Sequence, residues 1–193
     1  MSDTFALVVP PHSIRWLPPG QDCHDAQTGD ELLVKHNTIL ADAITIGQDA
    51  MALTRPQLRG YTSLDHNAFI RGSKDGRTMV SEMGPKGYER RPLYDYVAHM
   101  YAVVHYEVAD EQRSAAVAFD EAMKDVDYGW EEYVDDILDG LTHLKFVGSW
   151  GDNIICSTHL TLVTMAMGFM PALMPSAVVP AHRAMWLQAQ RPR

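Results

Sequence analysis

The sequence predicts an α+β domain in which helices pack against an antiparallel β-sheet. Short alternating stretches are separated by turns rich in glycine and proline, and the strongest β-forming stretch, 101–108, lies near the middle of the chain. Longer amphipathic or apolar stretches follow it. With 193 residues, of which 46% are hydrophobic and 21% charged, the chain is long enough to bury one core. We therefore expect a single domain over 1–193, with a proline-rich lead at 1–27.

The first elements expected after the lead are a strand and a helix. Thr28-Gly29-Asp30 is typical of a turn, and the apolar stretch 31–34 that follows it predicts a short strand. Asn37 or Thr38 can then cap a helix, because the apolar residues that follow recur at helical spacing.

A β-hairpin is expected next. The alternating stretch 64–70 predicts a strand, 72–76 predicts the hairpin loop, and 78–83 predicts the returning strand. The stretch 92–100 then predicts one or two turns of helix.

A strand and an amphipathic helix come next. The stretch 101–108 predicts a central strand, and 109–126 predicts a helix. The apolar stripe of that helix is expected to consist of Ala116, Val117, Phe119, Ala122 and Met123. A glycine-containing turn, 127–130, ends it.

The last third is expected to end in a buried helix. An acidic, solvated segment, 131–139, leads to the apolar stretch 144–147 and a loop at 148–153. The stretch 155–169 has the length and apolar content of a buried helix.

Composition excludes several classes of function. Sixteen Lys and Arg against 25 Asp and Glu give a net charge of −9, which repels polyanions, so we expect no nucleic-acid partner. Two cysteines, Cys23 and Cys156, are too few for a disulfide framework. The first twenty residues lack a basic region, and prolines interrupt the apolar stretch 160–179. We therefore expect neither a secretory signal nor a membrane span.

The predicted hairpin brings His66 and Glu82 together. If 72–76 is the loop, Arg71 pairs with Arg77, and the constant index sum of an antiparallel pair places His66 opposite Glu82. A carboxylate at that distance orients an imidazole and stabilises its charged form. A surface ion pair on a half-exposed sheet is the alternative interpretation.

Cys156 lies in the first turn of the predicted helix 155–169. The unpaired N–H groups and dipole of a helix N-terminus favour a thiolate, and the same groups can receive an oxyanion. With an imidazole as proton acceptor and a carboxylate behind it, such a thiolate completes an acyl-transfer constellation. A small buried side chain is the alternative, and it is the commoner role of a free cysteine.

Several short motifs, in this order, resemble those of the circularly permuted papain-like hydrolases of the NlpC type. They extend roughly from Gly29 to Trp186 and comprise Gly29-Asp30-Glu31-Leu32-Leu33, the helix from Thr38, the strand 64–70, Ser81-Glu82, Tyr128-Gly129-Trp130, Ile155-Cys156-Ser157 and Val179-Pro180-Ala181. The resemblance implies a permuted papain-like fold: an antiparallel sheet or barrel packed against helices, with the nucleophile at a helix N-terminus.

The resemblance also implies roles for individual residues. Cys156 would be the nucleophile, His66 the general base and Glu82 the residue that orients His66. The resemblance places Tyr128 and Trp130 near the cleft, as an aromatic wall for substrate. Packing residues are the alternative interpretation of both.

Two further candidate substrate contacts flank these residues. Ser157 follows Cys156, as the Cys-Ser pair of the family leads one to expect. Asp65 stands where the family usually has Ser or Thr, beside the base. It can raise the pKa of His66 or contact a cationic group of the substrate.

By the resemblance, the expected activity is hydrolysis of an amide bond through a thioester, with peptidoglycan stem peptides as the first-choice substrate. A lipid- or acyl-directed thiol hydrolase or acyltransferase on the same scaffold is one alternative. A non-catalytic virion, assembly or binding protein is another. We expect a peptide or acyl substrate and no cofactor. The sequence leaves the oligomeric state open and is compatible with a cytoplasmic or phage-associated protein.

Other candidate residues carry less weight. Cys23-His24 with Cys156 and His159 offer four potential zinc ligands, but adjacent ligands rarely reach one tetrahedral metal, so no metal site is expected. His99 and His105 lie in apolar stretches and are expected to be packing or interface residues.

Overall fold

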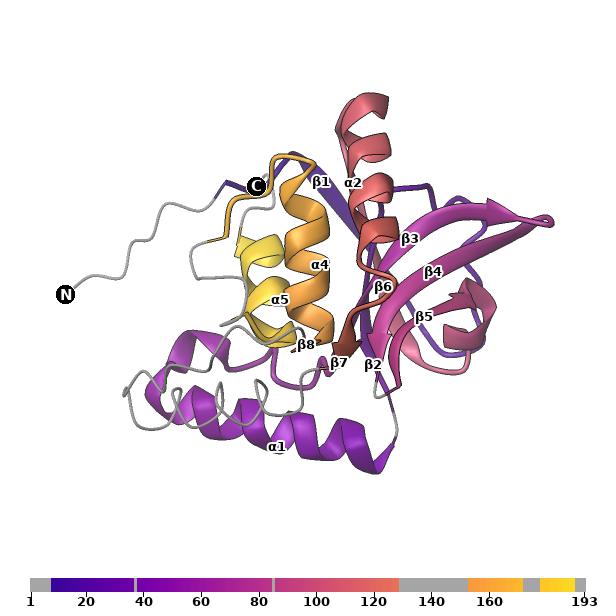
Figure 1. Ribbon diagram of the computed structural model, residues 1–193. Coiled ribbons are helices and arrows are strands. Elements are labelled where there is room, and N and C mark those ends of the chain that lie inside the picture. Colours follow the sequence, from indigo (N-terminus) through magenta and orange to yellow (C-terminus); the bar gives the residue numbers. More distant parts are fainter. Residues whose placement is uncertain (1–7, 37, 85, 129–152, 172–177, 190–193) are drawn as a thin grey trace.

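The computed structural model describes residues 8–36, 38–84, 86–128, 153–171 and 178–189 (Figure 1). For 39, 40, 127, 128, 153 and 154 it describes the backbone alone. The elements, in chain order, are β1 (His12–Leu17), β2 (Glu31–Lys35), α1 (Ile39–Thr54), η1 (Pro56–Leu58), β3 (His66–Lys74), β4 (Arg77–Gly84), β5 (Gly87–Pro92), η2 (Leu93–Tyr96), β6 (Met100–Tyr106), α2 (Asp110–Ala122), β7 (Asp127–Tyr128), β8 (Asn153–Ile154), α4 (Cys156–Met165) and α5 (Pro180–Ala189). The predicted α+β class is confirmed.

The centre of the fold is a six-stranded sheet with the strand order β1-β6-β2-β3-β4-β5, in which every neighbouring pair is antiparallel. The prediction of a central strand at 101–108 is confirmed, because β6 lies between β1 and β2. A separate two-stranded parallel ladder joins β7 to β8, directly before α4.

Both faces of the sheet are covered, so β2 is buried on both sides. Leu33 and Phe69 point into the core that α2, α4 and α5 cover. Leu32 and Ala68 point the other way, into a second core closed by η2 and the segment around Cys23. Figure 1 shows α4 and α5 side by side against the sheet, with α1 crossing below them. The alternation of a β-strand explains this division between two cores.

Two expected helices begin where local signals placed them. The N-cap of α1 is Thr38, whose hydroxyl accepts from the backbone N–H of Ala41 at 3.1 Å. Cys156 is the first residue of α4, and Ile155 is its N-cap. In the stretch 92–100, by contrast, the helix is the short 3₁₀ segment η2 alone.

The predicted hairpin exists, but its predicted loop and register are wrong. Strand β3 continues to Lys74, which pairs with Arg77, so the turn has two residues rather than five. Both of its residues, Asp75 and Gly76, have positive φ, as a type I′ turn requires. A bulge between Ile70 and Gly72 also shifts the pairing. The Asp-Gly pair was the signal for this tighter turn.

The predicted apolar stripe of α2 is partly wrong. Phe119 is exposed, and so is Ala122. The buried side instead includes Ala116, Asp120 and Met123. Residues four and three positions apart share a helix face, so a carboxylate takes the place that an apolar residue was expected to fill.

Six elements were not expected: β1, η1, β5, α5 and the short strands β7 and β8, the first of which lies where a turn was expected at 127–130. The lead 1–27 contains β1, which pairs with β6, so part of it belongs to the sheet. Strand β5 and helix α5 were likewise missed. The expected segments 131–139, 144–147 and most of 148–153 lie outside the described residues. Within the described part of the chain, no helix is long and apolar enough to span a membrane.

Candidate active site

Adjacent strands supply His66 and Glu82, and the two side chains are in contact. Nε2 of His66 donates to Oε2 of Glu82 at 2.5 Å. The pairing of Ile70 with Val80, continued along the strands, places Ala68 opposite Glu82 and makes His66 its diagonal neighbour. The predicted register was off by two residues, and a shift of two keeps the same face, so the contact survives the error.

Cys156 approaches His66 from α4. Its sulfur is hydrogen-bonded to the imidazole. Because Glu82 engages Nε2, Nδ1 is the ring nitrogen left for the sulfur. Both side chains are largely buried: Cys156 is 4% exposed and the His66 side chain 12%. The structure therefore brings all three residues, expected from the sequence as a catalytic set, into one continuous contact.

Three donors hold the carboxylate of Glu82. His66 and the hydroxyl of Tyr96 both donate to Oε2, and Nε of Arg91 lies 2.7 Å from Oε1. Burial raises the pKa of Glu82, but His66, Tyr96 and Arg91 lower it further, from 4.5 to about 2. Glu82 is therefore a carboxylate at any pH near neutrality.

The imidazole of His66 is held in its charged form. Burial lowers its pKa, but the negative charge of Glu82, the charge of Cys156 and the hydrogen bonds to both raise it. The net pKa lies well above 6.5. The site thus favours an imidazolium between two groups that can be anionic.

Asp65, expected to act on His66 or on a substrate, has its carboxylate bound to His36. It is buried, and its Oδ1 accepts from the backbone N–H of His36 at 2.8 Å. Its Oδ2 lies 3.1 Å from Nδ1 of the same residue. The His36 ring packs against that of His66, with centroids 5.4 Å apart. Asp65 therefore fixes the neighbour of the base rather than the base itself.

The structure describes the other candidate substrate contacts, Ser157, Tyr128 and Trp130, to different extents. Ser157 is fully buried and donates its hydroxyl to the carbonyl of Val178, so it joins α4 to the segment before α5 and does not line a cleft. The backbone of Tyr128 pairs with Ile154 in the ladder before α4, and the structure describes no more of this residue. Trp130 lies outside the described residues.

A buried polar network fixes the helix that carries Cys156. His159, one turn further along α4, has Nε2 3.0 Å from Oδ1 of Asp120 in α2. Ser81 and Tyr88 each donate to Asp120 at 2.7 Å, as does Arg71. The network therefore ties α2 and α4 to three strands of the sheet. Sequence reasoning missed it because nothing local marks Asp120 as buried.

The zinc alternative finds no support in the geometry. His159 is engaged by Asp120, while Cys23 accepts from Nη2 of Arg15 at 2.6 Å and donates to Asp25 at 3.3 Å. Among the described residues, no group of three or more His, Cys, Asp or Glu side chains is placed to hold a metal ion.

The expectation for His99 and His105 is met in part. His99 packs edge-on against His36, with centroids 4.7 Å apart, and Nδ1 of His105 lies 2.9 Å from Asp30. Burial and the charge of His36 lower the pKa of His99.

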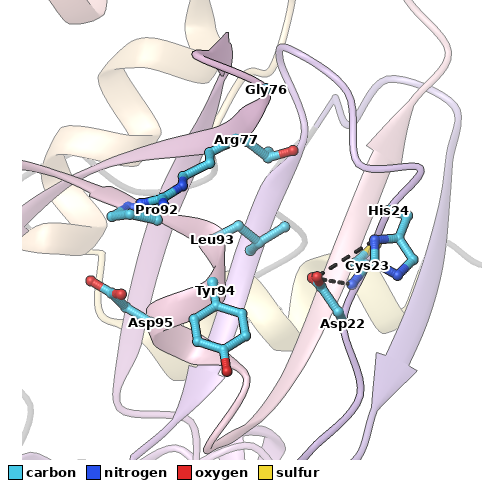
Figure 2. Close-up of a pocket in the computed structure, with 10 residues that line it drawn as sticks. Asp22, Cys23, His24, Gly76, Arg77, Pro92, Leu93, Tyr94 and Asp95 are labelled. Carbon is cyan, nitrogen blue, oxygen red and sulfur yellow. Dashed lines mark hydrogen bonds and ion pairs between the residues drawn. The ribbon is translucent and has the colours of Figure 1, made fainter.

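A cavity of about 570 Å³ is lined in part by η2. Figure 2 shows Arg77, Tyr94 and Asp95 on one side of it, with Asp22 and His24 on the other. Its described lining does not include His66, Glu82 or Cys156. Helix η2 is common to both places, because Leu93, Tyr94 and Asp95 line the cavity and Tyr96 contacts Glu82.

Comparison with known proteins adds no family assignment. No protein-family model matches the chain, and the search of curated proteins finds no match.

Proposed function

We propose that the protein is a cysteine hydrolase in which Cys156 is the nucleophile, His66 the general base and Glu82 the residue that orients and charges His66. The observation that supports it is the continuous contact from sulfur to imidazole to carboxylate, made by side chains of three separate elements. A thiol, an imidazole and a carboxylate in this order are suited to proton transfer from sulfur to nitrogen. The resemblance to NlpC-type hydrolases points the same way.

In the first half of the reaction, the proton of the Cys156 thiol already lies on His66, and the Cys156 thiolate attacks the carbonyl carbon of an amide. The carbonyl oxygen becomes an oxyanion beside the first turn of α4, where the N-cap Ile155 supplies no side-chain hydrogen bond. Backbone N–H groups of this turn, including that of Cys156, stabilise it. The intermediate then collapses to a thioester as the imidazolium gives its proton to the leaving amine.

In the second half, His66 is neutral again and accepts a proton from water, which attacks the thioester carbon. The second tetrahedral intermediate expels the Cys156 thiolate and releases a carboxylic acid. With its pKa lowered to about 2, Glu82 is ionised and does not take the proton from the imidazolium of His66. Its role is to hold and charge the ring rather than to accept the proton.

A peptide amide of the peptidoglycan stem is the proposed substrate, on the strength of the motif resemblance. The net charge of −9 disfavours electrostatic attachment to an anionic cell wall. We therefore assign recognition of the substrate to contacts within the site rather than to a basic surface.

Selective alkylation tests the nucleophile. Cys23 and Cys156 are almost equally buried, at 2% and 4% exposed, so burial alone predicts equal and slow labelling. Burial and Asp25 raise the pKa of Cys23, whereas Cys156 faces an imidazolium. We expect iodoacetamide at about pH 6.5 to label Cys156 roughly tenfold faster or more, as mass spectrometry would show. Equal rates would contradict the proposal.

Turnover tests the substrate class. Purified protein would be given muropeptides and short-chain acyl esters in parallel, with Cys156→Ala as the inactive variant and Cys23→Ala as the matched control. We expect amine release from muropeptides by wild type and Cys23→Ala alone. Turnover of esters but not muropeptides would reject the peptidoglycan substrate, and turnover of neither, together with equal labelling, would reject the hydrolase.

A further inference from the structure

Tyr96 is a partner of Glu82 that the sequence did not indicate. It is the last residue of η2, and its ring is buried, 3% exposed, against the second core of the sheet. Its hydroxyl donates to Oε2 of Glu82. That oxygen is also the one that faces Nε2 of His66. A single carboxylate oxygen is therefore bound both by the hydroxyl and by the imidazole.

Arg91 binds the other oxygen from a different environment. Its Nε lies 2.7 Å from Oε1, and its side chain is 42% exposed. The same guanidinium also pairs with Glu89, two residues before it on β5, the edge strand of the sheet. Arg91 therefore draws the carboxylate toward the solvent side, whereas the buried hydroxyl of Tyr96 holds it on the side of His66.

We infer that Tyr96 is a positioning residue of the proposed hydrolase: its hydroxyl holds Oε2 of Glu82 against Nε2 of His66. The catalytic meaning of this inference rests on the proposed function, but the geometric relation can be measured without substrate. When the hydroxyl is removed, Arg91 and His66 are the described side chains left on the carboxylate. The carboxylate then turns toward Arg91, and its contact with His66 weakens.

Titration of His66 tests the inference, because Glu82 is one of the groups that raise its pKa. In Tyr96→Phe the ring stays and the hydroxyl goes. We expect the pKa of His66, followed by NMR, to fall by about one unit. The pH profile of Cys156 alkylation should shift in the same direction.

The other charged or titratable groups around His66 are the same in both proteins. Among the residues that the structure describes, they are Cys156 from α4 and His36, which follows β2 and is paired with Asp65. A shift in the variant therefore reports on the hydroxyl.

Tyr101→Phe is the matched control. This variant also removes one hydroxyl from a buried tyrosine. The hydroxyl donates to the carbonyl of Gln21 at 3.0 Å and not to Glu82. We expect it to leave the titration of His66 unchanged. An unchanged titration in a folded Tyr96→Phe, or an equal shift in Tyr101→Phe, would overturn the inference.

Two further variants show whether Tyr96 acts through Glu82. In the Glu82→Gln background, adding Tyr96→Phe should change the pKa of His66 no further, because no charge is left to position. An equal shift in both backgrounds would contradict the inference. If Tyr96→Phe fails to fold, Arg91→Gln, which changes a half-exposed residue, is used in its place to test the inference. It should leave the pKa of His66 the same or higher, and a fall would assign the positioning to Arg91 instead.

A separate measurement, the alkylation of the wild type, shows whether the proposed function fails. If Cys156 of the wild type is alkylated no faster than Cys23, the hydrolase is rejected. The NMR titrations of His66 still decide whether Tyr96 positions Glu82.

Discussion

His66 and Glu82 make their 2.5 Å hydrogen bond from diagonal rather than opposite positions on β3 and β4. Diagonal neighbours on one face of a sheet are far enough apart that only long side chains meet. Glutamate and histidine together span that gap, and a shorter aspartate at position 82 would fall short of the ring.

The stability of the protein should depend on pH through this pair. The pKa of His66 is raised in the folded state, so its contribution is complete below 6.5 and is lost as pH rises through the folded value. The pKa of Glu82 is lowered, so its contribution is present above 4.5 and is lost as pH falls toward about 2. Between pH 4.5 and pH 6.5, both residues contribute fully to the stability of the fold.

Urea unfolding of wild type and Glu82→Gln across this range checks the prediction. The difference in unfolding free energy should be largest in the window of overlap, by up to ~3 kcal/mol, and should shrink on both sides. A difference independent of pH would show that the pair contributes no linkage.

Asp120→Asn should destabilise the fold strongly. The carboxylate is fully buried and accepts from four side chains, and an amide turns one of its two acceptor oxygens into a donor. We expect a loss of ~3 kcal/mol by chemical denaturation. Cys156 alkylation should also slow, because His159 loses its anchor one turn along α4. Glu121→Gln removes the neighbouring, exposed carboxylate, which pairs with Arg71 and Arg90; it is the control and should change stability little. Equal effects of the two variants would show that the buried network is not what matters.

Arg183 and Glu31 form a fully buried ion pair, with Nε of Arg183 2.9 Å from Oε1 of Glu31. Arg183→Met should cost ~4 kcal/mol of unfolding free energy, because it leaves Glu31 charged and unpaired. Adding Glu31→Gln removes that charge and keeps an acceptor for the hydroxyl of Tyr106. We expect the double variant to recover most of the loss in the same denaturation assay. A double variant as unstable as Arg183→Met alone would mean that lost packing, not the unpaired charge, sets the cost.

Asn67 should be replaceable by an apolar residue with a gain in stability. It is fully buried in β3, and neither polar atom of its side chain has a hydrogen-bond partner within the described part of the chain. Leaving such groups unsatisfied costs about 1 to 3 kcal/mol, so Asn67→Leu should raise the unfolding free energy by ~1 kcal/mol. Thermal and urea unfolding measure it. A loss of the same size would show that the amide binds a polar group in solution.

The candidate site was predictable from the sequence to the extent that local rules govern it. Cys156 opens a helix at the start of the apolar stretch, as expected, and Thr38 caps α1 with its own hydroxyl. The contact of His66 with Glu82 followed from alternation alone, since an error of two residues in the register keeps both on one face. The five-residue loop was wrong because the Asp75-Gly76 turn was not recognised.

The sequence by itself determined the α+β class, the strands with clear alternation, the start of the Cys156 helix and the shared face of His66 and Glu82. Local periodicity and capping carry that information, because they act over a few residues. Only the tertiary structure decided that Tyr96 and Arg91 hold Glu82, that Asp65 binds His36 and that Asp120 is buried. Those contacts join residues on different elements, and the order of the strands and the packing of the helices set them. A buried carboxylate is stabilised by hydrogen-bond donors that lie on other elements of the fold.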